Sequence, residues 1–341
     1  LTQAFEPEVA LITQVHCNQP LAFDSCDQYI QEQATLTARP THTLTILNHS
    51  DDYSIGLRAQ AQTRIQTIGI DTPDADLSAT NVRVGLEATR FDLRHDDNTY
   101  QGQMTRLLGR HNLYGALASL LVGQYFDIPI SEGLSALAEI EPLPGQMNAL
   151  RGVNGSLLID DSHQADNAST LAALDWLQTV RQQAEAQSKR TIVVMGDHSM
   201  TSPNGQHASS LRLIGQRVAQ VADVLITQGT EAAIIAEAAR NSNMRKVRAA
   251  HSLRETMQTF NLLRLGAKDI VLFKGNAHSQ MEQVVAALLE NASDRERLTR
   301  QNLAPSPQLG TGQRPLQPSW VEVNPQTLAN NVRILRNGLG N

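Results

Sequence analysis

Three short segments late in the sequence hold most of the side chains suited to chemistry. They are residues 160–163 (Asp-Asp-Ser-His), 196–198 (Gly-Asp-His) and 274–276 (Lys-Gly-Asn). Each follows a short apolar run typical of a buried strand, and in a parallel sheet such positions gather at the carboxyl ends, where ligands bind. We therefore expect a ligand site at this edge. His198 has no evident base or nucleophile partner in the sequence and is expected to be a loop histidine.

A fourth segment, residues 109–112 (Gly-Arg-His-Asn), opens an apolar helical stretch that runs to Phe126. The N-terminus of a helix offers unpaired backbone N–H groups and a positive dipole end, which suit an anion or a polar ligand. His111 and Asn112 would then face that ligand. The alternative is a His-Asn helix cap that binds nothing.

The second half of the chain alternates apolar runs with helical patterns. The expected strands are 156–160, 191–195, 223–227, 269–273 and a weaker one at 246–250; the expected helices are 168–184, 207–222, 231–241, 253–265 and 280–290. Strands that alternate with helices of this length predict a parallel, doubly wound sheet.

The first half is less regular, and the two ends of the sequence have features of their own. Strands are expected at 8–13 and 43–47, with short β-like pieces between 63 and 107, and Pro142, Pro144 and Gly145 mark a domain boundary. A Pro/Gly/Ser/Gln-rich linker occupies 304–317, after which a strand and a helix begin again. The chain enters a strand at once and stops soon after this restart, so we expect a segment of a longer protein.

Composition excludes several classes of function. The chain has 341 residues and a formal net charge of -6, which argues against nucleic-acid binding through bulk charge. No apolar run approaches the ~20 residues that span a bilayer. Cys17 and Cys26 suit a reducing, cytoplasmic compartment and are expected to be buried thiols rather than a metal site with His16.

Lysine is unevenly distributed along the chain. It occurs only at Lys189, Lys246, Lys268 and Lys274, so the first 188 residues contain none. This gap excludes a phosphate-loop lysine from that part of the sequence.

Several segments, in order along the chain, resemble motifs of the Mur ligases, the ATP-dependent enzymes of peptidoglycan precursor synthesis. Residues 47–52 resemble L-N-x-D-D, residues 109–118 resemble G-x-H-N-x-x-N-A-L-A, residues 154–162 resemble N-G-x-x-x-I-D-D-S, and residues 274–285 resemble K-G-S-R-x-x-x-M-E-x-V-V. The last two segments resemble the branch that joins D-alanyl-D-alanine to a UDP-N-acetylmuramoyl-tripeptide. The similarity extends over residues 5 to 292.

The resemblance implies an α/β fold, with part of a Mur ligase central domain at 1–143 and a doubly wound, Rossmann-like C-terminal domain at 144–295. It implies that ATP, with Mg²⁺, phosphorylates a carboxylate of a UDP-muramoyl-peptide and that D-alanyl-D-alanine attacks the acyl phosphate. By the same resemblance the catalytic candidates are Asp161 and Lys274. The nucleotide-binding candidates are Asn48, His111, Asn112 and Arg151, and the substrate-binding candidates are Asp160, Ser162, His163 and Asn276; no residue is predicted to bind a metal.

Other positions depart from the family pattern. By resemblance, a metal-side histidine of the family falls at Gln19 or Pro20, a lysine that is carboxylated in several members falls at Gln33, and the hinge arginine falls at Gln146, with Arg151 as a nearby substitute. Two functions therefore stay open. One is a ligase whose catalytic residues are partly lost, in which case this chain alone is not expected to turn over ATP. The other is a non-catalytic ligase-like module that organises or regulates an attached racemase.

The racemase hypothesis comes from the C-terminal end. After the linker, placed at 296–318, residues 319–341 resemble the opening W-x-E-I and N-x-x-x-L-R segments of alanine racemase; the alternative is a chance amphipathic helix. Racemase makes D-alanine, the precursor of the dipeptide that the ligase consumes. The resemblance implies a fused domain that dimerises and binds pyridoxal phosphate through a lysine beyond Asn341.

Overall fold

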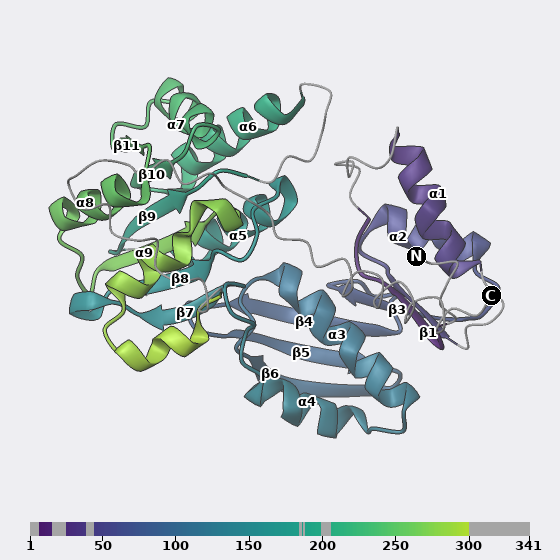
Figure 1. Cartoon of the computed structure of the whole chain (residues 1–341). Helices are drawn as coiled ribbons and strands as arrows, with labels where there is room; N and C mark the ends of the chain where they lie inside the picture. Colours follow the sequence, from purple (N-terminus) through teal and green to yellow (C-terminus); the bar gives the residue numbers. More distant parts are fainter. Residues whose placement is uncertain are drawn as a thin grey trace, which may run out of the picture. The chain divides into compact units, whose positions relative to one another are not determined.

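The computed structural model describes residues 7–15, 25–38, 44–183, 186, 188–198 and 206–299. These residues form two six-stranded sheets, each covered by helices (Figure 1). The first sheet has the order β1-β2-β3-β4-β5-β6, with parallel pairing from β1 to β4 and antiparallel pairing from β4 to β6. Its strands are β1 (Val9–Ile12), β2 (Leu44–Asn48), β3 (Arg64–Ile70), β4 (Leu77–Val84), β5 (Thr89–His95) and β6 (Asn98–Thr105).

Helices pack on both faces of the first sheet. On one face α3 buries Leu113, Leu117 and Leu120, whose spacing of three and four residues places them on one side of the helix. On the other face a smaller cluster joins α1, β2 and η1. The helices are α1 (Cys26–Thr37), α2 (Asp52–Gly56), η1 (Leu57–Gln60), α3 (Arg110–Tyr125) and α4 (Ile130–Glu139).

The second sheet has the order β11-β10-β9-β12-β8-β7, in which only the edge strand β7 is antiparallel. Helices α5, α6 and α7 contribute to the hydrophobic cluster on one face, and α8 and α9 to the cluster on the other. Its strands are β7 (Asn148–Arg151), β8 (Leu157–Asp161), β9 (Arg190–Met195), β10 (Val224–Gln228), β11 (Val247–Ala250) and β12 (Asp269–Lys274). Its helices are η2 (Val153–Gly155), α5 (Asn167–Arg181), α6 (Gln206–Val221), α7 (Ala232–Asn241), α8 (Leu253–Leu263), η3 (Ala277–Ser279), α9 (Met281–Leu288) and η4 (Ala292–Arg297).

The predicted α/β fold with a largely parallel, doubly covered sheet is confirmed. The Rossmann-like part of that prediction is not confirmed, because β12 lies between β8 and β9. In the Rossmann order 3-2-1-4-5-6 the first two strands are neighbours. The chain therefore places its last strand between its first two parallel strands, which brings Lys274 beside Asp161.

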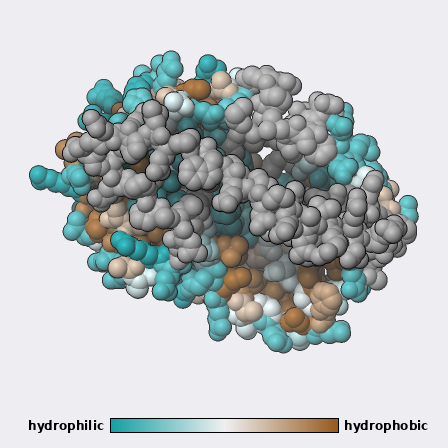
Figure 2. All heavy atoms as spheres, in the orientation of Figure 1, coloured by the Kyte–Doolittle hydropathy of each residue, from teal (hydrophilic) through white to brown (hydrophobic). Residues whose placement is uncertain are grey.

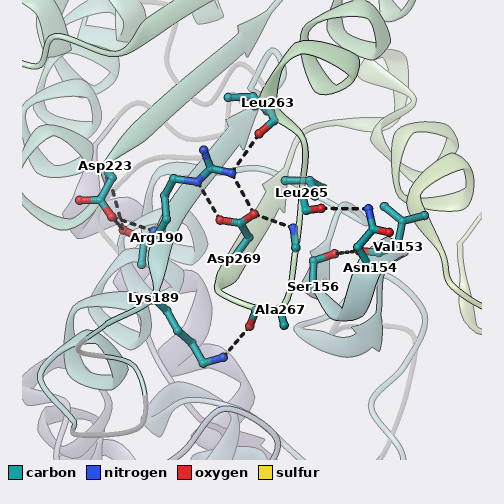
Figure 3. Close-up of polar contacts among 12 residues, drawn as sticks. Val153, Asn154, Ser156, Lys189, Arg190, Asp223, Leu263, Leu265, Ala267 and Asp269 are labelled. Atoms are coloured by element: carbon teal, nitrogen blue, oxygen red, sulfur yellow. Dashed lines mark hydrogen bonds and ion pairs between the residues drawn. The ribbon is translucent and has the colours of Figure 1, made fainter.

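A polar network holds the amino ends of the central strands, at the edge opposite the expected site (Figure 3). Arg190 binds Asp269 with two hydrogen bonds, from Nε to Oδ1 at 2.7 Å and from Nη2 to Oδ2 at 2.8 Å. Asp223 accepts a hydrogen bond from the backbone N–H of Thr191 at 2.8 Å. Bidentate arginine–carboxylate pairs fix geometry as well as adding stability, so this network sets the register of β9 and β12 from their amino ends.

Where Figure 2 colours the described residues, hydrophobic ones are interspersed with hydrophilic ones, and several lie over the area that α4 occupies in Figure 1. Phe126 and Ile128, in the turn between α3 and α4, are exposed. Among the described residues, no helix is both long and apolar enough to cross a membrane.

One prediction about the cysteines is wrong. Cys26 is disulfide-bonded rather than a thiol, and Cys17 and His16 lie outside the described residues. Cys26 stands half-buried at the first turn of α1, capped by Ser25, and not in a hydrophobic core. A cysteine in this position is accessible to a second sulfur in a way that a core thiol is not.

Candidate functional site

A buried ion pair marks the carboxyl edge of the second sheet. Lys274, the last residue of β12, lies opposite Asp161, the last residue of β8, in the strand register. The Nζ atom of Lys274 donates to Oδ2 of Asp161 at 2.7 Å, and both residues are buried. Burial raises the pKa of Asp161, while the Lys274 ammonium and a backbone hydrogen bond from Met147 act in the opposite direction. The pair therefore holds two charges in a place where either one alone is unfavourable.

The start of α3 carries the second group of site residues. Gly109 has a φ of 86°, and a Cβ atom on it would stand 2.7 Å from Cε1 of His111. Only glycine accepts this backbone and leaves room for the imidazole to fold back over it. Asn112 donates from Nδ2 to the carbonyl oxygen of Leu108 at 2.8 Å, which fixes its carboxamide beside the first turn.

His111 is neutral at physiological pH. Burial lowers its pKa to about 4, and the positive charge of Lys274 adds to that effect. A neutral imidazole has one nitrogen that donates and one that accepts a hydrogen bond, so His111 offers polar recognition without charge. The electrostatic influence of Lys274 also shows that the start of α3 and the end of β12 face the same space.

Both groups line one cavity of about 230 Å³, here called the lysine cavity. It brings together five of the predicted site residues, which are His111, Asn112, Asp161, His163 and Lys274. Asn112 and His111 come from α3, whereas the other three come from the end of β8, the turn after β8 and the end of β12. The structure therefore joins motifs that lie more than a hundred residues apart in the sequence.

A second cavity, of about 420 Å³, shares His111, Asp166 and Ser169 with the lysine cavity. We call it the aromatic cavity because Tyr114 and Trp176 line it. In a chain with only 4% aromatic residues, this pairing gives the cavity flat apolar walls.

Three predicted site residues instead have structural roles. Asn48 donates from Nδ2 to the carbonyl oxygen of Thr13 at 2.7 Å and accepts from the N–H of Ser50, so its carboxamide ties the ends of β1 and β2 together. Asn276 caps η3 by accepting from the N–H of Ser279. Asp160 is fully buried and does not line the lysine cavity.

Ser162 and Arg151 also lie away from the lysine cavity. The N–H of Ser162 donates to Oδ1 of Asp160 at 3.2 Å, which forms the tight turn after β8. Arg151 lines a different cavity together with Arg106 and Arg297, and its Nη2 lies 3.6 Å from Oε1 of Glu87. The structure does not bring Arg151 to Gln146, which lines the lysine cavity, and so does not place it as a substitute there.

A model of the Mur ligase middle domain matches residues 1–123. The chain is similar to Mur ligases over this segment and, at low identity, beyond it. It is 24% identical over 295 residues to the UDP-N-acetylmuramoyl-tripeptide–D-alanyl-D-alanine ligase of Escherichia coli, an alignment that covers 84% of this chain and 61% of the relative. It is also 24% identical over 233 residues to the UDP-N-acetylmuramoylalanine–D-glutamate ligase of Nitrosomonas europaea, covering 66% of this chain and 47% of that protein.

Solved structures of Mur ligases share the fold. MurF from Acinetobacter baumannii has a TM-score of 0.69 at 20% identity, covering 84% of this chain and 61% of that one. MurF from Thermotoga maritima in complex with ADP has a TM-score of 0.65 at 15% identity, covering 85% and 63%. The chain thus spans less than two thirds of the length of these Mur ligases.

Several residues that line the cavities were not predicted from the sequence. Asp166 and Ser169 form a capping box at the start of α5 and line both cavities. The spacing of Asp166 and Ser169 is the signal that would have identified this helix start. No comparable signal marks Tyr114, Trp176 or Gln164, because only the fold brings α3, α5 and the turn after β8 to these cavities.

The departures from the family pattern lie in different places. Gln146 lines the lysine cavity, whereas Gln33 is half-buried on α1, which contributes no residue to either cavity. Gln19 and Pro20 lie outside the described residues. Within the described part of the chain, no group of three or more His, Cys, Asp or Glu residues is arranged to hold a metal ion.

Proposed function

We propose that this chain belongs to an ATP-dependent, cytoplasmic amide ligase of peptidoglycan precursor synthesis that joins D-alanyl-D-alanine to a UDP-muramoyl-peptide. The similarity to the Escherichia coli ligase over 84% of the chain supports this branch of the family. The observation that carries the proposal is the lysine cavity, in which the start of α3 faces the Lys274–Asp161 pair. A helix N-terminus opposite a buried ammonium is suited to ligands that carry negative charge.

The adenosine part of ATP fits the aromatic cavity. Gly109, at the start of α3, lines this cavity together with Tyr114 and Trp176. The His111 imidazole offers a donor and an acceptor at the same place. No group of three or more His, Cys, Asp or Glu residues in the described part of the chain is arranged to hold Mg²⁺.

When bound, ATP supplies the phosphoryl group that activates a carboxylate toward an amine. The role of the protein is to position the reactants and to hold charge in fixed places. Asp161 keeps the Lys274 ammonium at one point of the cavity wall, Asn112 is held by Leu108, and neutral His111 lines both cavities. We infer that His163, which is exposed at the rim of the lysine cavity, contacts the incoming substrate.

A non-catalytic module is the second candidate, and one observation favours it. Each lysine or arginine that lines the two cavities, among the described residues, already has an acidic partner. Lys274 binds Asp161, and Nη2 of Arg110 donates to Oδ2 of Asp71 at 2.6 Å. An anionic ligand would have to compete with these carboxylates. The racemase that such a module would regulate rests on residues 319–341, which lie outside the described residues, so the fused domain and its pyridoxal phosphate stay predictions.

The deciding experiment is phosphate release from ATP by the natural full-length protein. We expect release that requires both UDP-muramoyl-tripeptide and D-alanyl-D-alanine. The double variant Asp161→Asn/Lys274→Met, which removes the pair without leaving one charge buried alone, should lower the rate by about 100-fold. Thr256→Val, on α8 away from both cavities, is the control and should keep the rate.

A folded wild-type protein that releases no phosphate with any of these substrates would contradict the ligase proposal. In that case the module hypothesis predicts a changed racemase rate or oligomeric state when residues 1–300 are removed.

A further inference from the structure

His198 is a buried histidine that the proposed reaction does not use. It follows Gly196 and Asp197 after β9, and only 2% of its surface is exposed. A loop histidine expected from the sequence would be solvated, so its burial calls for a specific role. Its imidazole contacts α5 on one side and is within the electrostatic influence of Lys274 on another.

The backbone around His198 is tightly held. Oδ1 of Asp197 accepts hydrogen bonds from the N–H groups of Glu231 and Ala232, both at 2.9 Å, at the start of α7. The carbonyl oxygen of His198 accepts from Nδ2 of Asn276 at 3.3 Å. A Cβ atom at Gly196 would stand 2.3 Å from Oγ of Ser279, so the chain passes closely over the loop after β12. These contacts fix the position of the His198 imidazole.

The imidazole in turn holds the first turn of α5. Nε2 of His198 and Oγ1 of Thr170 are 3.0 Å apart, and both side chains are buried. The N–H of Thr170 donates to the carbonyl oxygen of Asp166 at 3.0 Å. Thr170 directly follows Ser169, and Asp166 and Ser169 line both cavities. The position of this wall of the cavities therefore depends on the Thr170–His198 contact.

His198 is also uncharged beside the lysine. Burial lowers its pKa to about 4, and the Lys274 charge is the next cause. Lys274 thus lies near two neutral imidazoles, His111 from α3 and His198 from the end of β9, while its ammonium binds Asp161. A protonated histidine in this position would repel the ammonium.

We propose that His198 is a positioning residue that, through Thr170, holds the first turn of α5 against the Lys274 side of the lysine cavity. It acts through other residues and touches no ligand. The assignment concerns the same site as the proposed function, but its test reads the geometry of the cavity and not turnover.

The test uses the small number of lysines in the chain. The intact chain is treated with acetic anhydride, and peptide mass spectrometry then measures the rate at which each lysine is acetylated. The rate at Lys274 is compared with the rates at exposed Lys246 and Lys268, which serve as internal standards. In the wild type we expect Lys274 to be strongly protected. Thr170→Val, which removes one hydroxyl at nearly constant volume, should increase the relative rate at Lys274 by about fivefold, the effect of losing one hydrogen bond.

Thr256→Val is a closely matched control. Thr256 occupies the same position in the first turn of α8 that Thr170 occupies in α5, its N–H donates to the carbonyl oxygen of capping Ser252, and its hydroxyl donates to Oε1 of Gln228 at 2.8 Å. This variant should lower the midpoint of urea unfolding as much as Thr170→Val does while leaving Lys274 protected.

Two variants of the histidine complete the test. His198→Leu should increase the acetylation rate of Lys274 as much as Thr170→Val does. His198→Gln, which keeps a hydrogen-bonding group, should retain most of the protection of Lys274. Equal acetylation of Lys274 in Thr170→Val and Thr256→Val, or in His198→Leu and His198→Gln, would show that His198 is only a buried core residue. Neither result depends on whether the full-length protein releases phosphate.

Discussion

Asp160 and Asp161 are adjacent in β8 but face opposite sides of the sheet, because side chains alternate along a strand. Asp161 meets Lys274 in the lysine cavity, whereas Asp160 is fully buried on the side of α9. Burial raises the pKa of Asp160 to about 6, partly offset by hydrogen bonds from Ser162, and the charges of Asp161 and Glu282 raise it further. Oδ2 of Asp160 has no hydrogen-bond partner among the described residues.

The raised pKa makes Asp160 a source of pH-dependent stability. The folded state holds the Asp160 proton up to about pH 6, whereas the unfolded chain loses it near the ordinary aspartate pKa of 3.8. The native state therefore binds more protons in this window, and the contribution of Asp160 to stability falls as the pH rises from about 4 to 6, by up to about 3 kcal/mol.

Asp160→Asn removes this proton and should abolish that contribution. We expect the variant to be more stable than the wild type at pH 7.5 and to lose the advantage at pH 4.5, as measured by urea unfolding at both values. The Ser162 N–H keeps an acceptor in the variant, so the turn after β8 should be retained. If the variant and the wild type differ in free energy of unfolding by the same amount at both pH values, the assignment is wrong.

The sequence showed which residues of this region carry charge but not how they pair. Alternation along a strand separates Asp160 from Asp161 as soon as the strand is recognised. The partner of Asp161, however, is 113 residues away, and nothing in the local pattern shows that β12 inserts beside β8. The same limit applies to Arg151, which is near Gln146 in sequence but lines another cavity.

At the scale of elements, Gly109 at the N-cap of α3 and Gly115 within α3 have opposite requirements. Gly109, before the first turn, has a positive φ and carries the His111 ring where a Cβ would be. Gly115, further along the helix, has open space around it, since a Cβ added there would meet no atom within 4 Å. The same substitution therefore has opposite effects on one helix.

Gly109→Ala should destabilise the chain by about 1–3 kcal/mol, because alanine is strained at this backbone and displaces His111. Gly115→Ala should stabilise it by about 0.5–1 kcal/mol, since glycine in a helix interior is unfavourable relative to alanine. Thermal unfolding measures both. A titration of His111 by NMR should show its pKa rising from about 4 toward the solvated value in Gly109→Ala only. Parallel effects of the two variants would disprove the role assigned to Gly109.

Elements with a strong apolar pattern were predictable, and the exceptions have physical reasons. The five parallel strands of the second sheet follow apolar runs such as 191–195 and 269–273, and they form within a residue or two of the expected positions. The strand β7 (Asn148–Arg151) was not expected, since it is short and has polar residues at both ends. Its pairing with β8 supplies what the local sequence lacks.

At the scale of the whole described unit, α5 links the two sheets. Nε1 of Trp176 donates to the carbonyl oxygen of Gly85 at 3.1 Å, in the turn between β4 and β5. Val84 and Leu108, from the first sheet and the segment after it, belong to the same hydrophobic cluster as Trp176 and Leu177. The two sheets therefore share part of one core, although each also has a cluster of its own.

This shared core predicts that Trp176 couples the stability of the two sheets. Trp176→Phe removes the indole donor and part of the buried ring, which should cost about 1–3 kcal/mol. We expect hydrogen exchange to increase most in β4 and β5, because the turn between them loses its anchor on α5. Phe260→Leu, in the separate cluster under α8, is the control: it should lower stability similarly but increase exchange in β10 to β12. If both variants increase hydrogen exchange uniformly over the two sheets, Trp176 does not couple their stabilities. The remaining contacts of the shared core would then hold the cavities that α3 and α5 line.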